Sequence, residues 1–276
     1  MIKKSILFIV SLFVGMTIMA QETTSGAGKE NLVRKSGSLG SLVIIPFENR
    51  MYLSDADAPI GRETGLKPGE LQVKFRNSLT ETLEKEMQKD WDLIELYDPN
   101  SFELNESLKF IHGSVKYRFE PVSDKVLLAN DTTLEKKDLK KTNKNKKQKQ
   151  GIVDGQVVTT GDDTEKFMNM YIQNDSLMSF LDSTLKAEYY LFINEFDIRY
   201  HVSDPNQISS GGLVYKLKAH FTCIDDKGKV LVAGVSTSDV GAGTQNIYEI
   251  IVKSIPFLSE KIAKMIREFK LEEKSQ

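Results

Sequence analysis

The stretch SLVIIPFENR, residues 41–50, decides the fold. Its apolar part, Leu42–Phe47, is short and contains Pro46, whose missing N–H limits strand pairing. A run that is apolar on both faces and bounded by turn residues is typical of a strand buried in the middle of a sheet. In α/β proteins the loop after such a strand often holds a ligand or a partner. The candidate partner surface therefore consists of Glu48, Asn49, Arg50 and Tyr52.

The segment that follows predicts a β-α-β unit. Residues 51–67 are polar and predict a loop, and Pro68 suits the first turn of a helix. WDLIELY at 91–97 predicts a second short strand, which a right-handed crossover would place parallel to the first. Apolar residues at four-residue spacing predict one buried helix face made of Leu71, Phe75, Leu79, Leu83 and Met87.

The rest of the chain adds further elements on both sides of an insertion. Residues 104–111 predict a helix, and 114–122 alternate into Pro121 as a short or edge strand would. Apolar spacing over 164–185 predicts one or two amphipathic helices. Three strands follow, namely 189–200, which begins apolar on both faces, 213–223 and 230–235. The last two are joined by a turn with Gly228. The alternation gives 189–200 one solvent-facing side with Glu195 and Asp197, and places His220 and Thr222 opposite the apolar side of 213–223.

A final amphipathic segment at 247–269 predicts a helix with a kink or restart at Pro256. The order is thus β-α-β, an irregular insertion, then α-β-β-β-α. It predicts a single α/β domain with a mixed sheet and a three-layer arrangement. The expected segments are a signal peptide at 1–20, a flexible lead-in at 21–40, the domain at 41–270 with a disordered insertion at 134–163, and a polar tail at 271–276.

The first residues indicate export. Lys3 and Lys4 precede an apolar segment, Ile6–Ala20, that is shorter than a membrane span and ends in a small residue. Ile18 is less usual than alanine at its place before the cut, so an uncleaved anchor stays open. No cysteine follows the apolar segment, so we expect no lipid anchor, and the periplasm is the expected location. Cys223 is the single cysteine of the chain, which excludes an intramolecular disulfide and predicts a buried thiol.

The insertion carries a block of like charge between residues 134 and 150. Eight lysines stand there against two carboxylates, a net charge of about +6 in a segment with almost no apolar residues. It is either a tolerated surface insertion or an electrostatic tether to anionic lipid or polysaccharide. Export and the lack of aromatic residues among the lysines argue against nucleic acid. The basic residues are Lys136, Lys137, Lys140, Lys141, Lys144, Lys146, Lys147 and Lys149.

The sequence contains no recognisable enzyme motif. His112, His201 and His220 belong to no recognisable metal-binding spacing, and neither H-E-x-x-H nor G-x-S-x-G occurs. Asp55-Ala56-Asp57 fails as a calcium loop because Pro59 takes the third ligand position, and Gly241-Ala242-Gly243 lacks the third glycine of a dinucleotide fingerprint. We therefore assign no catalytic, metal or cofactor residue, and expect nothing downstream to supply catalytic or metal-binding groups to the loop after the first strand.

Several short motifs resemble a known group of envelope proteins. VIIPFEN after an export signal, WDLIELYD, AEYYLFINEFDI and the hairpin FTCIDDKGKVLVAG look like TolB N-terminal-like and CsgG-like domains. Those domains open with a strand ending in Pro-Phe, matched by Pro46-Phe47, and carry late strands around an acidic turn with glycine, matched by Asp225 or Asp226 with Gly228. The resemblance implies a mixed α/β sandwich and a role in protein–protein assembly at the envelope. The missing lipid-acceptor cysteine departs from many relatives.

These observations predict an exported, non-enzymatic binding or scaffolding protein of a bacterial cell envelope, which acts through protein partners in envelope assembly or secretion. The first alternative is a module that binds an anionic membrane or polysaccharide through its lysine segment. The second is an enzyme of unrecognised class, which would require a concave pocket that gathers ionisable groups from distant segments.

Overall fold

A computed structural model describes the chain in several ranges. They are 38–96, 102–121, 127–129, 151–153, 156–158, 166–201, 214–240, 244 and 246–274. The chain divides into two units, Met1–Val33 and Arg34–Gln276, and every described residue belongs to the second. The expected signal peptide and most of the lead-in therefore lie outside the described residues, as do the lysine segment and Gly241-Ala242-Gly243.

The opening stretch forms β1, Ser41–Ile45, as predicted. It pairs in parallel with β3, Asp92–Ile94, on one side and with β9, Tyr189–His201, on the other. Because side chains alternate along a strand, Leu42 and Ile44 enter one hydrophobic core, whereas Val43 and Ile45 enter a second core. This strand therefore supports a core on each face of the sheet.

Around β1 the sheet is mixed. Its strand order is β3-β1-β9-β10-β11-β5, where β10 is Val214–Asp225, β11 is Val230–Val240 and β5 is Leu127–Ala129. Strands β9, β10 and β11 form an antiparallel meander, and β5 adds in parallel to β11. The predicted turn between β10 and β11 contains Gly228 at φ 81°, a left-handed conformation that glycine adopts without strain. Cys223, on β10, is buried as predicted.

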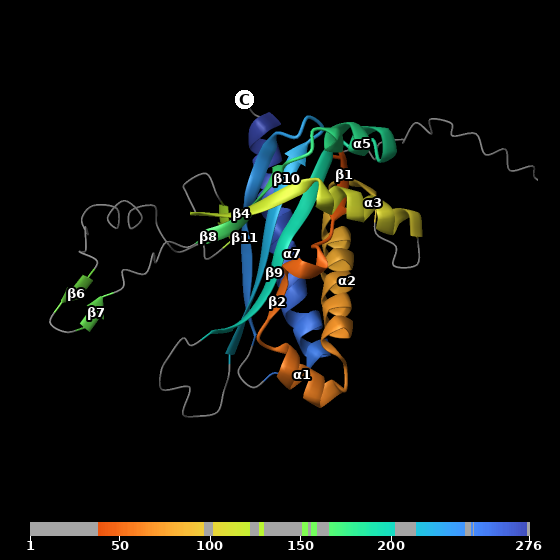
Figure 1. Ribbon diagram of the computed structural model, residues 1–276. Helices are drawn as coiled ribbons and strands as arrows, with labels where there is room; N and C mark the ends of the chain where they lie inside the picture. Colours follow the sequence, from red (N-terminus) through yellow and green to blue (C-terminus); the bar gives the residue numbers. More distant parts are fainter. Residues whose placement is uncertain are drawn as a thin grey trace, which may run out of the picture. The chain divides into compact units, whose positions relative to one another are not determined.

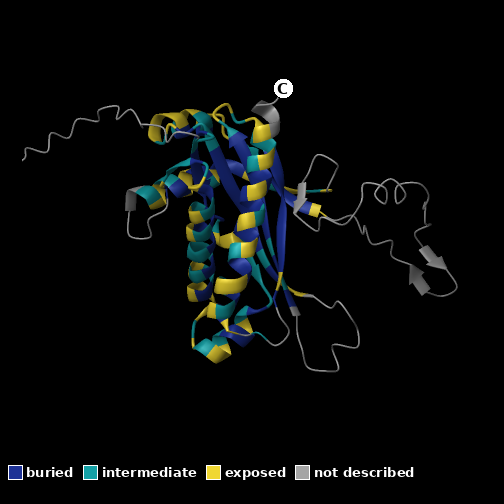
Figure 2. Ribbon diagram, turned by 180° about the vertical axis from the view of Figure 1, so that it is seen from behind, coloured by how far each residue is buried: buried dark blue, intermediate teal, exposed yellow. Residues whose placement is uncertain are grey.

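Two long helices cover one face of this sheet (Figures 1 and 2). They are α2, Pro68–Met87, and α7, Ile247–Lys274, which pack side by side. All five apolar residues that predicted one face of α2 are buried, and α7 runs as a single helix through Pro256, so the alternative of a restart there is wrong. None of the helices in the described ranges combines the length and the apolar character that crossing a bilayer requires.

The opposite face carries shorter elements. They are α3, Phe102–Gly113, α5, Ser176–Thr184, and a two-stranded ribbon of β4, Val115–Pro121, with β8, Lys166–Ile172. The helix and edge strand expected at 104–122 are thus confirmed. With α2 and α7 on the other side, the predicted α/β fold with a mixed sheet is confirmed (Figure 1).

Two local predictions were wrong. Residues 51–67, predicted as a loop, begin at the end of a 3-10 turn, Asn49–Met51. They then form strand β2, Tyr52–Ser54, which pairs in parallel with β9, and helix α1, Asp57–Thr64. The first half of the helical prediction over 164–185 is instead β8. There Phe167 packs with residues of β11 while Met170 joins the second core, so apolar side chains leave both faces of a strand and imitate helical spacing.

The disorder expected at 134–163 was too broad. Within it, β6, Gly151–Val153, and β7, Gln156–Val158, form an antiparallel pair of their own. The remaining residues of that range lie outside the described parts of the chain.

Candidate functional site

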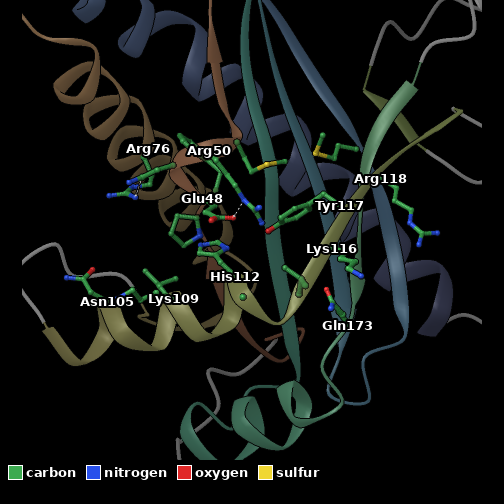
Figure 3. A pocket seen from close by; sticks show the side chains of 18 residues that line it. Glu48, Arg50, Arg76, Asn105, Lys109, His112, Lys116, Tyr117, Arg118 and Gln173 are labelled. Atoms are coloured by element: carbon green, nitrogen blue, oxygen red, sulfur yellow. Dashed lines mark hydrogen bonds and ion pairs between the residues drawn. The ribbon is translucent and has the colours of Figure 1, made fainter.

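A pocket of about 940 Å³ opens beside the loop that follows β1 (Figure 3). Its walls come from that loop, from α2, from the end of α3 and from β4, which are far apart in sequence. This volume lies in the range of ligand pockets in proteins. The apolar part of the lining consists of Pro46, Phe47, Met51, Leu108, Val115 and Met168.

The loop is fixed to α2 through Asn49. The Asn49 side-chain oxygen accepts a hydrogen bond of 2.7 Å from Nη1 of Arg76, and its backbone oxygen accepts one from Gln72. Next to it, Nε of Arg50 lies 2.6 Å from Oε2 of Glu48 in an ion pair. These contacts hold the two charged side chains of the loop at the pocket (Figure 3).

Positive charge predominates in the lining. Five basic residues line the pocket against the single carboxylate of Glu48, with the side chains of Lys116 and Arg118 on the outer face of β4 (Figure 3). Lys109 is also 3.1 Å from Glu106, and Arg118 lies over the ring of Tyr171, but both remain at the surface. A concave surface lined by one sign of charge concentrates ligands of the opposite sign. The basic residues are Arg50, Arg76, Lys109, Lys116 and Arg118.

Two further polar groups of the lining are uncharged. His112 Nδ1 and the Tyr117 hydroxyl oxygen are buried atoms with no hydrogen-bond partner among the described residues. Burial lowers the pKa of His112 to about 4, against the opposing effect of Glu48 and with smaller lowering effects of Arg76 and Arg50, so its imidazole is neutral at pH 7. Burial also raises the pKa of Tyr117, which keeps its hydroxyl proton. Because unmet buried polar groups are costly, this pair is suited to a ligand's polar atoms.

The structure brings together three of the four residues of the candidate partner surface. Glu48, Asn49 and Arg50 line the pocket, but Tyr52 does not. The Tyr52 hydroxyl donates a 2.6 Å hydrogen bond to Oδ1 of Asp57, and its ring stacks between aromatic neighbours under α2. The Tyr52 side chain thus contributes to packing.

That no downstream element supplies catalytic or metal-binding groups to this loop stays a prediction, but two downstream elements do bring polar side chains to it. His112 comes from the end of α3 and Tyr117 from β4, and both approach the Glu48–Arg50 pair (Figure 3). No local spacing in the sequence relates these residues to the loop. They reach it only because α3 and β4 fold back over the carboxyl end of β1.

A second cluster of ionisable groups lies under the β4–β8 ribbon. Glu195 and Asp197 of β9 and His220 of β10 bring their ligand-type atoms within 4.8 Å of one another. The alternation placed Glu195 on a solvent-facing side and His220 on the side of its strand opposite the apolar one, but each is only 2% exposed because the ribbon covers them. His220 and Glu195 face each other across the paired strands, with Nε2 and Oε1 separated by 3.7 Å.

The hydrogen bonds of His220 argue against a metal ion in this cluster. Nδ1 accepts a 3.0 Å hydrogen bond from the backbone N–H of Met168, so the neutral ring carries its proton on Nε2, the atom that faces Glu195. Burial lowers the pKa of His220 to about 3. Burial, together with the neighbouring Asp197, raises the pKa of Glu195 to about 7. The cluster is therefore suited to holding a proton between carboxyl groups.

Neighbouring polar side chains attach the ribbon to the sheet. Asn194 donates a 2.8 Å hydrogen bond to the backbone oxygen of Met168, and the Thr222 hydroxyl accepts one of 3.3 Å from the N–H of Met170. Thr222, on the same side of β10 as His220, is also fully buried. The polar alternation of β9 and β10 thus serves a buried interface with β8.

No protein-family model, no curated protein and no solved structure matches this chain. The resemblance to TolB N-terminal-like and CsgG-like domains stays a prediction.

Proposed function

We propose that this chain is an exported, non-enzymatic binding or scaffolding protein of a bacterial cell envelope. The pocket beside Glu48–Arg50 is its partner site. The observation that carries the proposal is the pocket itself, which combines an apolar lining, a basic rim and two buried polar atoms without partners. Such a combination is typical of a binding site with a few orienting groups.

The pocket also meets the first requirement of the enzyme alternative, since ionisable groups from distant segments converge there. Its chemistry favours binding. Among the described residues that line it there is no serine, threonine or cysteine to act as a nucleophile beside His112, and the one carboxylate among them pairs with Arg50. An ion pair next to a neutral imidazole is suited to recognising a charged group.

The proposal is tested by crosslinking in intact cells. A photoreactive amino acid at Lys109, on the pocket rim, is expected to give a discrete adduct with an envelope protein. The same amino acid at Lys253, an exposed position of α7, is the matched control. A protein that is recovered alone and monomeric from both positions would remove the support for a partner site.

Export is checked on the same cells. The mature chain is expected in the periplasmic fraction with its N-terminus at Gln21, which mass spectrometry of the purified protein measures. An intact Met1 in the membrane fraction would instead indicate the uncleaved anchor.

A further inference from the structure

Strand β4 has a free edge. It pairs with β8 on one side and with no other described strand. An edge strand presents unpaired N–H and C=O groups and can accept a further strand from another chain.

The hydrogen bonds of β8 show which backbone groups of β4 point away from the ribbon. The backbone N–H of Met168 donates to His220, and that of Met170 donates to Thr222. The backbone N–H groups of both methionines therefore point away from β4. In an antiparallel pair, the residues opposite them also turn their backbone groups outward. Those residues are Phe119, opposite Met168, and Tyr117, opposite Met170.

This free edge borders the pocket. Four consecutive residues of β4, Val115 to Arg118, line the pocket. Because neighbouring side chains of a strand point to opposite faces, a pocket lined by all four lies along the edge of the strand. Tyr117 points from β4 toward Arg50 across the pocket (Figure 3). The exposed Lys116 and Arg118 add positive charge on the outer face of the ribbon. A segment that pairs here is thus flanked by basic side chains on both faces.

We propose that an extended, acidic segment of a partner protein adds to β4 as a third strand of the ribbon. Its backbone bonds to Tyr117 and Phe119, and its carboxylates lie against the basic side chains of the pocket. The free edge supplies affinity through main-chain hydrogen bonds, and the charges select an acidic sequence. This inference rests on the proposed partner site and specifies the class of partner.

The first test needs no variant. The probe is a pool of peptides of about eight residues, long enough to span β4 when extended, that alternate glutamate with valine, isoleucine, threonine or tyrosine. We expect the mature protein to enrich members of this pool. Enriched peptides whose alternate backbone amides are N-methylated keep their charge but lose their N–H groups, and should bind at least about tenfold more weakly. Versions with lysine in place of glutamate should not bind.

The second test removes one backbone donor of β4. Tyr117→Pro deletes the outward N–H and leaves the pairing of Lys116 and Arg118 with β8 in place, as proline is tolerated at a strand edge. Tyr117→Val loses the same phenol but keeps the N–H, and is the matched control. We expect the proline variant to bind the enriched peptides at least about tenfold more weakly than the valine variant. The thermal unfolding midpoint of each variant confirms that it folds.

The outcomes separate the inference from the function beneath it. If no acidic peptide is enriched, or if N-methylated and unmodified peptides bind equally, strand addition is wrong. If in that case Lys109 still gives a discrete adduct in cells, the partner site stands and the partner binds it by another geometry. If Lys109 gives no adduct either, both proposals fail.

Discussion

Glu195 is the single residue whose burial has the clearest measurable consequence. Its pKa is raised from 4.5 to about 7, and burial also raises the pKa of Asp197, although Arg199 and Lys218 oppose that shift. Between those two pH values the folded chain keeps a proton that the unfolded chain has lost. The free energy of unfolding should therefore fall as pH rises through this window, by up to about 3 kcal/mol.

Glu195→Gln keeps a neutral side chain of the same shape and should remove most of that pH dependence. We expect the variant to be more stable than the natural protein at about pH 8 and equal to it at about pH 4, as measured by urea unfolding. Glu260→Gln, at an exposed position in the middle of α7, is the control and should change neither value. Equal pH dependence in Glu195→Gln and the natural chain would contradict a protonated buried carboxyl.

At the scale of elements, helix α7 continues through Pro256. Proline has no N–H to offer the carbonyl of Val252 and crowds the preceding turn. Pro256→Ala should therefore raise the free energy of unfolding by about 1–3 kcal/mol in urea. Glu260→Ala, on an exposed position one turn later, should change it by less than about 0.5 kcal/mol. A destabilised Pro256→Ala would mean that the packing of α7 requires the local geometry of the proline.

Local periodicity predicted the elements whose apolar side chains obey one rule. The apolar residues of α2 recur every four residues, and those of β9 and β10 alternate along much of each strand. Each pattern matches one type of element, so the helix and the two strands could be predicted. Strand β8 could not be predicted in this way, because Phe167 and Met170 are buried on opposite faces of the strand by different neighbours. Strand β2 and helix α1 were missed because the burial of Tyr52 and Ile60 comes from tertiary packing in the first core, which includes Phe47, Phe75 of α2 and Phe196 of β9.

At the scale of the whole molecule, the loop after β1 was identified from sequence, but its surroundings were not. Glu48, Asn49 and Arg50 follow a buried strand, and this position in the sequence predicts that they belong to a binding surface. His112 and Tyr117 meet them through the crossing of α3 and β4 over the sheet. Such an approach depends on tertiary contacts that carry no local spacing. The same limit applied to Glu195 and His220, whose meeting depends on strand register.

The lysine segment gives a prediction for the complete chain. Deleting residues 134–150 should leave the free energy of urea unfolding within about 0.5 kcal/mol, because shortening a long connection changes its closure entropy little. If the segment is a tether, the intact chain should sediment with vesicles containing anionic lipid at low salt, and the deleted chain should not. Equal sedimentation of the two proteins would rule out the tether.

The edges of the main sheet have a consequence for how the protein behaves when crowded. Strands β3 and β5, which end the sheet on either side, are each three residues long. Such short edges offer few consecutive pairing groups to a neighbouring copy, which is a common natural protection against aggregation. A chain built this way can remain dispersed at high concentration while its long strands β9 and β10, which are paired on both sides, stay inaccessible to intermolecular pairing.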